Sequence, residues 1–227
     1  MPESELQRLC LDTLTGGAVQ TYVDLIYLIA EGKTDVGTLT RVRAALVQAE
    51  TSRRRGDTAS VISSYADAAR IFADKRNPRT SIYFLERSLD IAKLTNNHVA
   101  EMESYHLLGE AYEALGDAER ALTFHEAHRE LASTVGDSSE KAAAATQLVR
   151  VYTKQASDAE ARGDTEVALK LYLAAADAAG ASQQPATQLE PLYSAGKTFV
   201  GLGKAAEAIP LLQQYVCARA FTTGRIA

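Results

Sequence analysis

A repeat of about forty residues constrains this chain more than any other feature of its sequence. Leu108 and Tyr112 correspond to Leu148 and Tyr152, which lie forty residues later in the chain. A fixed period of roughly 20 to 50 residues is typical of proteins built from stacked copies of one structural unit. The repeat therefore predicts an array of similar elements that bury their apolar faces against one another.

The remaining copies keep the same internal spacing, with one informative exception. Gly163 and Ala168 of the third copy come seven residues later than the period predicts. Seven residues are close to two turns of an α-helix, so the apolar face keeps its phase while the helix lengthens. We therefore expect one elongated helix over residues 138–162. The residues that recur in the other copies are Ala69, Phe72, Ser81, Phe84 and Ile91 before the reference copy and Gly196, Phe199, Gly203, Ala208 and Leu212 after it.

Glycine–aspartate pairs separate the expected helices. Glycine suits the left-handed end of one helix, and aspartate suits the N-cap of the next. The pairs are Gly56-Asp57, Gly116-Asp117, Gly136-Asp137 and Gly163-Asp164. The helices that we expect span 5–14, 18–30, 40–55, 58–75, 79–95, 98–115, 118–135, 138–162, 165–180, 186–202 and 205–220. Pro210 lies inside the last of these, where its ring and missing N–H favour a kink or a later start.

Small and aromatic positions indicate how the two helices of a repeat pack. Gly109 and Ala121 allow two antiparallel helices to approach closely, and Tyr112 and Phe124 fill the space beside them. This order of residues resembles the tetratricopeptide repeat family. The expected fold class is all-α: a right-handed α-solenoid of tetratricopeptide-type helical hairpins. We expect an N-terminal helical region in residues 1–57, the repeat array in 58–220 and a tail in 221–227.

Composition indicates which kinds of stabilising group, partner and location suit this chain. The chain has 227 residues, of which 46% are hydrophobic and 23% charged, so it can bury a core without a metal or a disulfide. The net charge of -5 argues against nucleic acid as the main partner. Cys10 and Cys217 form no disulfide framework, which suits free thiols in the cytoplasm. We expect no targeting segment and no membrane span, because the most apolar run, residues 22–30, is too short.

Two local motifs resemble chemical sites, and the residues around both favour a structural role. Gly196-Lys197-Thr198 resembles the end of a phosphate-binding loop, but Pro191 replaces the first glycine and no strand precedes it. We expect Gly196 to be a small packing position instead. His125 and His128 share a helix face but lack further ligands, so we expect a solvated or core-edge pair. With no recognisable nucleophile or cofactor motif, the sequence predicts neither an enzyme nor a bound cofactor or metal.

The first helix of each repeat is expected to line a concave, partner-binding face. The repeat register places nine residues there: Arg70, Glu103, His106, Glu110, Glu113, Arg150, Lys154, Tyr193 and Lys197. A clamp for the carboxylates of a chaperone tail would need Lys and Asn at matching positions, and this pattern is not met. Glu110 could alternatively form an internal charge ladder with Arg70 and Arg150, and the sequence favours neither interpretation.

Several stretches in order also resemble the axonemal tetratricopeptide repeat protein 29 family. They are residues 49–57, 63–94, 107–117 and 148–172, together with the elongated helix and the spacing of residues 188–217. The resemblance implies a non-catalytic scaffold of the axoneme in a cilium or flagellum, needed for motility. The partners that it implies are the inner-arm dynein heavy chain and a MYND zinc-finger axonemal protein.

An alternative function and one additional partner remain open from the sequence. The chain also resembles cytosolic tetratricopeptide adaptors that bind a peptide segment of a polarity or signalling partner. The run from Arg53 to Arg55 suits the C-terminal turn of a helix, where the helix dipole favours cations. With Lys75, Arg76 and Arg79 it could instead face the acidic surface of a microtubule.

Overall fold

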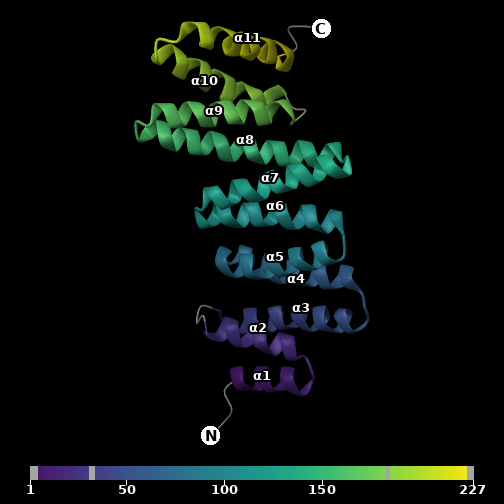
Figure 1. The fold of residues 1–227 in the computed structure, drawn as a ribbon. Coiled ribbons are helices and arrows are strands. Elements are labelled where there is room, and N and C mark those ends of the chain that lie inside the picture. Colours follow the sequence, from purple (N-terminus) through teal and green to yellow (C-terminus); the bar gives the residue numbers. More distant parts are fainter. Residues whose placement is uncertain (1–4, 31–33, 183–184, 224–227) are drawn as a thin grey trace. The chain divides into compact units, whose positions relative to one another are not determined.

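The computed structural model describes residues 5–30, 34–182 and 185–223. Within these ranges it contains eleven α-helices, one short 3₁₀ turn and no β-strand (Figure 1). The chain forms two compact units, Met1–Leu115 and Gly116–Ala227, which we call the first and second units. The predicted all-α class of stacked helical pairs is therefore confirmed.

The first unit consists of six helices. Helices that follow one another in the chain pack against each other, and α4 and α6 also make contact, so both lie against α5. Tyr65 and Phe72 each stack on Phe84, with ring centroids 6.4 and 5.8 Å apart. These rings form the aromatic centre of the unit. Its helices are α1 (Glu5–Thr15), α2 (Val19–Ala30), α3 (Val36–Arg54), α4 (Thr58–Asp74), α5 (Pro78–Leu94) and α6 (His98–Leu115).

The second unit contains five helices and the 3₁₀ turn. Its longest element is α8, whose 24 residues confirm the expected elongated helix. Small side chains, among them Ala159 and Ala195, fill its core beside Tyr172 and let the helices approach closely. The elements are α7 (Ala118–Val135), α8 (Ser138–Ala161), α9 (Thr165–Gly180), η1 (Pro185–Gln188), α10 (Leu189–Gly201) and α11 (Ala205–Thr222).

Gly196 is confirmed as a close-packing position. It lies within α10 and is buried. A methyl group added to its Cα would lie 2.7 Å from Leu212 Cδ2 and 2.8 Å from Leu212 Cγ on α11. Such distances are too short for van der Waals contact, so glycine sets how closely α10 and α11 approach.

The glycine–aspartate pairs form the predicted turns, with one difference. The four glycines have φ between 75° and 84°, and Asp57, Asp117 and Asp137 accept a backbone hydrogen bond at the start of the next helix. Asp164 occupies the equivalent position without such a bond. Its carboxylate instead lies 3.4 Å from Arg162 Nε, which draws it away from the helix end.

Two helix starts differ from the expected ones, and that of α11 agrees. α3 begins at Val36 rather than at residue 40, because Asp35 caps it by accepting from the Thr38 N–H at 2.9 Å. The helix expected from residue 186 starts as the 3₁₀ turn, and its α-helical part begins at Leu189. α11 begins at Ala205, so Pro210 does not delay its start. Residues 224–227 of the expected tail lie outside the described residues.

Candidate protein-binding grooves

A groove of about 340 Å³ lies between α4 and α6, with the start of α5 at its base. We call it the α4–α6 groove. The spacing of its residues explains its shape, because three- and four-residue steps along a helix place side chains on one face. Five of the twelve side chains are alanines, whose small size leaves a hollow. The lining residues are Ala66, Ala69, Arg70, Ala73, Arg76, Pro78, Ser81, Leu85, Leu107, Glu110, Ala111 and Ala114.

Arg70 and Glu110, two residues predicted from the repeat register, both line this groove. Their contacts are local: Arg70 Nη1 forms an ion pair with Asp67 Oδ1 at 2.7 Å, and Glu110 Oε1 lies 3.5 Å from the imidazole Nε2 of His106. Each pair joins residues three or four positions apart on one helix. In the first unit, these local pairs replace the alternative ladder between Arg70 and Glu110. Exposed pairs of this kind contribute at most about 1 kcal/mol.

A smaller pocket of about 160 Å³ adjoins the groove along the same two helices. Arg70 lines both hollows, and Glu103 lines the smaller one. At its base, Ser88 Oγ lies 3.3 Å from Ser104 Oγ, which satisfies two buried hydroxyl groups. The structure thus brings Arg70, Glu103 and Glu110 to one continuous surface.

The second unit has a groove of its own, of about 520 Å³, which includes residues of α8 and the start of α10. Arg150 and Lys154 line it, as the repeat register predicts. Arg150 Nη2 donates to Gln147 Oε1 at 2.7 Å, which holds the guanidinium along the surface of α8. Asp158 of α8 and Glu190 of α10 line the same groove, so its charges are mixed.

The other predicted residues lie near these grooves or along α10. Glu113 is half-buried on α6. Tyr193 is 51% exposed, and its ring centroid lies 5.4 Å from that of Tyr215 on α11. Lys197 Nζ lies 3.9 Å from Glu160 Oε1 of α8. That these residues bind a partner stays a prediction.

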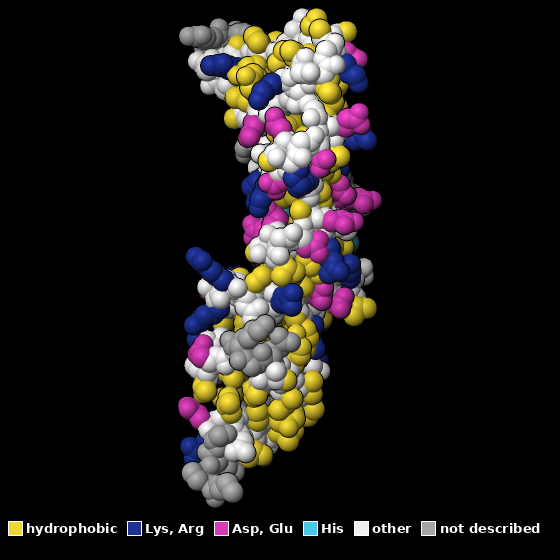
Figure 2. All heavy atoms as spheres, turned by 90° about the vertical axis from the view of Figure 1, so that its left-hand side faces the viewer, with side chains coloured by type: hydrophobic (Ala, Val, Ile, Leu, Met, Phe, Trp, Pro, Cys, Tyr) yellow, Lys and Arg dark blue, Asp and Glu magenta, His cyan; other side chains and the backbone are white. Residues whose placement is uncertain are grey.

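An apolar surface covers α1 and α2 at the end of the first unit. Figure 2 shows the apolar side chains gathered there. A groove of about 450 Å³ runs between the two helices and has no charged residue in its lining. Exposed apolar patches are commonly contact surfaces. Six large apolar residues on these helices are each at least 37% exposed: Leu11, Leu14, Val19, Val23, Ile26 and Tyr27.

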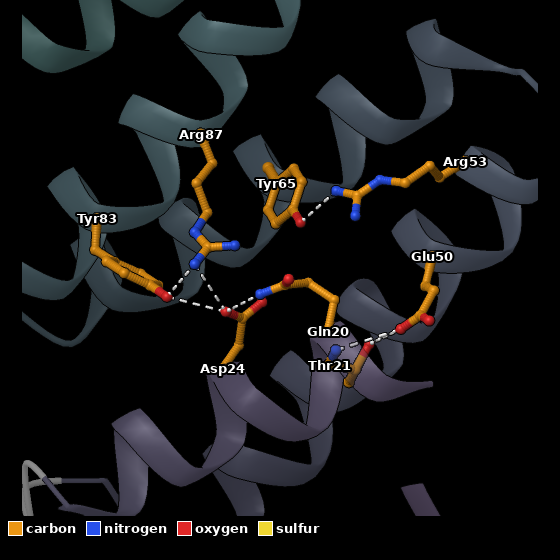
Figure 3. Close-up of polar contacts among 8 residues, drawn as sticks. All are labelled: Gln20, Thr21, Asp24, Glu50, Arg53, Tyr65, Tyr83 and Arg87. Carbon is orange, nitrogen blue, oxygen red and sulfur yellow. Dashed lines mark hydrogen bonds and ion pairs between the residues drawn. The ribbon is translucent and has the colours of Figure 1, made fainter. Parts of the chain in front are cut away.

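A buried polar cluster joins α2 to α5 (Figure 3). Asp24 is fully buried, and its Oδ1 accepts hydrogen bonds from Tyr83 Oη at 2.9 Å and Gln20 Nε2 at 3.1 Å. Arg87 Nη2 lies 3.2 Å from the same oxygen. The Arg87 guanidinium also covers the Tyr83 ring, 4.6 Å from its centroid. This cluster anchors the N-terminal helices to α5.

The electrostatics of the cluster follow from burial. Loss of water raises the pKa of Asp24, although Arg87 and the hydrogen bonds from Tyr83 and Gln20 act in the opposite direction. Asp24 Oδ2 is buried without a hydrogen-bond partner among the described residues, which is consistent with this direction. Burial, together with the nearby Asp24 carboxylate, raises the pKa of Tyr83 to about 12, so its hydroxyl stays a donor. Nothing in the local sequence around Asp24 indicated these partners.

The comparison with family models finds a match in the middle of the chain. Residues 57–134 match the model of the tetratricopeptide repeat. The match covers α4 to α7 and thus every residue that lines the α4–α6 groove. The chain is also 32% identical over 104 residues to tetratricopeptide repeat protein 29 of Trypanosoma brucei brucei (strain 927/4 GUTat10.1). That alignment covers 46% of this chain and 22% of the relative's length.

One solved structure supports the fold of stacked helical pairs, and a second is reported beside it as a likeness only. The crystal structure of a Podosopora anserina kinesin light chain with nearly identical TPR-like repeats has a TM-score of 0.50 and 20% identity. The alignment covers 96% of this chain and 94% of that one. BtubC (BKLC) from P. vanneervenii aligns with 14% identity and a TM-score of 0.47, over 98% of this chain and 94% of its own.

The histidine pair of the tetratricopeptide segment belongs to the core. His125 and His128 on α7 are 0% and 1% exposed, so of the two expected alternatives, a solvated or a core-edge pair, the solvated one is wrong. α8 covers this face of α7, and His128 Nε2 lies 2.9 Å from Glu140 Oε2. The part of the chain that the structure describes holds no group of three or more His, Cys, Asp or Glu residues arranged for a metal ion. No described helix has the length and apolar character needed to span a membrane.

Proposed function

We propose that this protein is a non-catalytic scaffold that binds a segment of a protein partner in the α4–α6 groove. The observation that supports it most directly is the alanine-lined hollow within the tetratricopeptide segment. A concave, mostly apolar surface with a few charged groups at its rim suits recognition of a peptide segment. Tetratricopeptide repeats are interaction modules in general, and no cluster in the described residues suggests a catalytic centre.

We further propose that the scaffold acts in the axoneme of a cilium or flagellum, in association with inner-arm dynein. Two findings support this step. The order of the repeats, with the elongated helix α8, resembles the axonemal family, and the chain is 32% identical over 104 residues to tetratricopeptide repeat protein 29. The partners in this proposal are the dynein heavy chain and a MYND zinc-finger axonemal protein.

The structure gives less support to a direct microtubule contact. Arg53 Nη2 donates to Tyr65 Oη at 3.0 Å, and Arg54 donates to the Gly17 carbonyl and to Glu50. Lys75 Nζ lies 3.7 Å from Asp35 Oδ2. Half of the basic cluster is therefore engaged within the first unit, and we do not include the microtubule surface in the proposal.

Affinity purification of the tagged chain from a flagellated cell tests the proposed function. After a moderate salt wash, we expect mass spectrometry to recover the inner-arm dynein heavy chain and the MYND protein. A variant with the groove filled, Ala114→Leu, should recover less of the directly bound partner, because Ala114 is an exposed part of its lining. Recovery of polarity or signalling proteins without dynein would instead identify a cytosolic adaptor.

A further inference from the structure

The outer face of α2 is apolar although it is exposed. Val19, Val23 and Ile26 are 56%, 50% and 43% exposed, and steps of four and three residues place them on one side of the helix. The opposite side packs inward through Leu25 and Leu28, which are fully buried. A helix that is apolar on both sides is normally buried on both sides. The composition of α2 thus indicates that a further surface packs against its outer face.

Helix α1 extends this apolar face. Leu11 and Leu14 are 46% and 41% exposed, and they line the groove of about 450 Å³ between α1 and α2 together with Ile26. Val19 and Val23 are exposed on α2 outside the lining of that groove. These five residues, which we call the α1–α2 face, therefore combine a groove with a neighbouring ridge.

The α1–α2 face is uncharged. Asp24 is the only charged residue of α2, and it is fully buried in the polar cluster with α5. On α1, Glu5, Arg8 and Asp12 recur at steps of three and four residues, which places them on a different side of the helix from Leu14. With one basic and two acidic side chains, α1 offers little attraction for an acidic partner or an anionic membrane.

We infer that the α1–α2 face joins two copies of this chain in a two-fold dimer. In such an interface both copies use the same surface, so the ridge of Val19 and Val23 on one copy enters the groove of the other, and the reverse contact forms at the same time. An uncharged face brings no like charges together when it meets itself. The inference goes beyond the proposed function, because it adds a second copy of the scaffold.

The area of the face is about what a dimer requires. Its five large side chains are each between 41% and 56% exposed. With the rest of the groove lining they offer on the order of 500 Å² of apolar surface per copy, the size of the largest patches on monomeric proteins. Two copies together bury about 1,000 Å², the lower limit for a specific interface. We therefore expect a dimer of moderate affinity.

Analytical ultracentrifugation of the full chain tests the inference. Between about 1 and about 100 µM, we expect the sedimentation coefficient to rise from that of a monomer to that of a dimer and then to stop, because a two-fold contact is closed. A monomer throughout this range would overturn the inference. Growth beyond the dimer would also overturn it, because it would indicate a head-to-tail contact between different surfaces.

Val23→Glu places a charge at the centre of the face. This variant should weaken dimerisation at least about tenfold, because its carboxylate would be buried among apolar side chains. Val167→Glu is the matched control, since Val167 on α9 is 48% exposed and lies outside the face. It should dimerise as the wild type does. Wild-type affinity in Val23→Glu would contradict the inference.

A milder variant and a change of salt complete the test. Val23→Ser removes apolar area without adding a charge, and it should also weaken the dimer if Val23→Glu fails to fold. Raising the NaCl concentration from about 0.1 to about 0.5 M should leave the affinity unchanged or raise it, because screening reduces the repulsion between copies of net charge -5. A tenfold loss of affinity in salt would place the contact on charged residues and overturn the inference.

Purification from cells distinguishes other occupants of the face and the proposed function. A protein that the wild type recovers and Val23→Glu does not, while the wild type is monomeric, would make the face a docking site for that protein and overturn the inference. Axonemal partners recovered with a chain that stays monomeric would overturn the inference and leave the scaffold function standing. A dimer that Val23→Glu disrupts, with no axonemal partner recovered, would support the inference and contradict the axonemal function.

Discussion

Single residues set how closely helices approach and which charges become buried. Gly196 shows the first effect, because α10 and α11 meet where any larger residue would collide with Leu212. Asp24 shows the second, because its carboxylate is fully buried against α5 and supported by Tyr83 and Arg87. A variant of Gly196 separates the effect of packing from that of helix propensity. A variant of Asp24 tests how its buried carboxyl group contributes to stability at different pH.

Gly196→Ala should destabilise the protein by about 1 kcal/mol or more, because the overlap with Leu212 outweighs the higher helix propensity of alanine. Gly180→Ala is the matched control, since nothing lies within 4 Å of a Cβ added there. It should leave the free energy of unfolding unchanged or raise it. Urea denaturation of both variants measures the difference, and equal effects would contradict close packing at Gly196.

Asp24→Asn should destabilise the protein more near pH 4 than near pH 7. The pKa of Asp24 in the folded state is raised above its ordinary value of 3.8 by burial. The folded state therefore binds the proton on Asp24 more tightly than the unfolded state does. The stabilisation that this gives is fully present below pH 3.8 and is lost as the pH rises through the raised pKa. Urea denaturation of variant and wild type across this range measures the effect. A destabilisation that grows with pH would show instead that the ion pair with Arg87 dominates.

At the scale of elements, turns and caps define where each helix begins and ends. Asp137 accepts hydrogen bonds from the backbone N–H groups of Ser139 and Glu140, both at 3.0 Å. Asp164 stands at the same place in its repeat and makes no such bond. The sequence pattern predicts an N-cap at both aspartates, whereas in the structure only Asp137 forms the capping hydrogen bonds.

Asp137→Ala should lower the free energy of unfolding by about 1 kcal/mol, the usual effect of losing an N-cap. Asp164→Ala should lower the free energy of unfolding by only about 0.3 kcal/mol, because the contact of Asp164 with Arg162 is exposed. Thermal unfolding of the two variants under identical conditions provides the comparison. A loss at Asp164 as large as that at Asp137 would mean that its carboxylate caps α9 in solution.

At the scale of the whole molecule, the chain consists of two compact units in which helices contact mainly their neighbours. Stability in such repeats is approximately a sum of local terms. A substitution should therefore loosen the helices around it more than distant ones. Regions of a protein open separately, and hydrogen exchange reports each of them.

Asp24→Ala should reduce hydrogen-exchange protection chiefly within residues 1–115. It leaves the half-buried Arg87 and the Tyr83 hydroxyl without the carboxylate that they contact, and it empties a buried position between α2 and α5. Gly196→Val is the reciprocal variant and should reduce protection chiefly within residues 116–227. Hydrogen exchange followed by mass spectrometry measures both. Uniform loss of protection along the chain in either variant would show that the molecule unfolds as one cooperative block.

The sequence predicted the local features of this fold because their causes are local. The αL glycines, the aspartate caps and the helical periodicity act within a few residues, so the turns at Gly56 and Gly136 could be located directly. The boundary of α3 was missed because the cap at Asp35 carries no glycine before it. The repeat period likewise placed Arg70 and Glu110 on one face before their groove was known.

The features that depend on contacts between distant residues required the tertiary structure. Asp24 meets Tyr83 across 59 residues, and no local pattern couples the two. The hollow of the α4–α6 groove exists because alanines on two helices line it from both sides. The sequence by itself determined the repeat, its helices and their turns, since these follow from backbone preference and periodicity. The tertiary structure decided which charges are buried and which line a groove, because burial depends on the helices that pack against each residue.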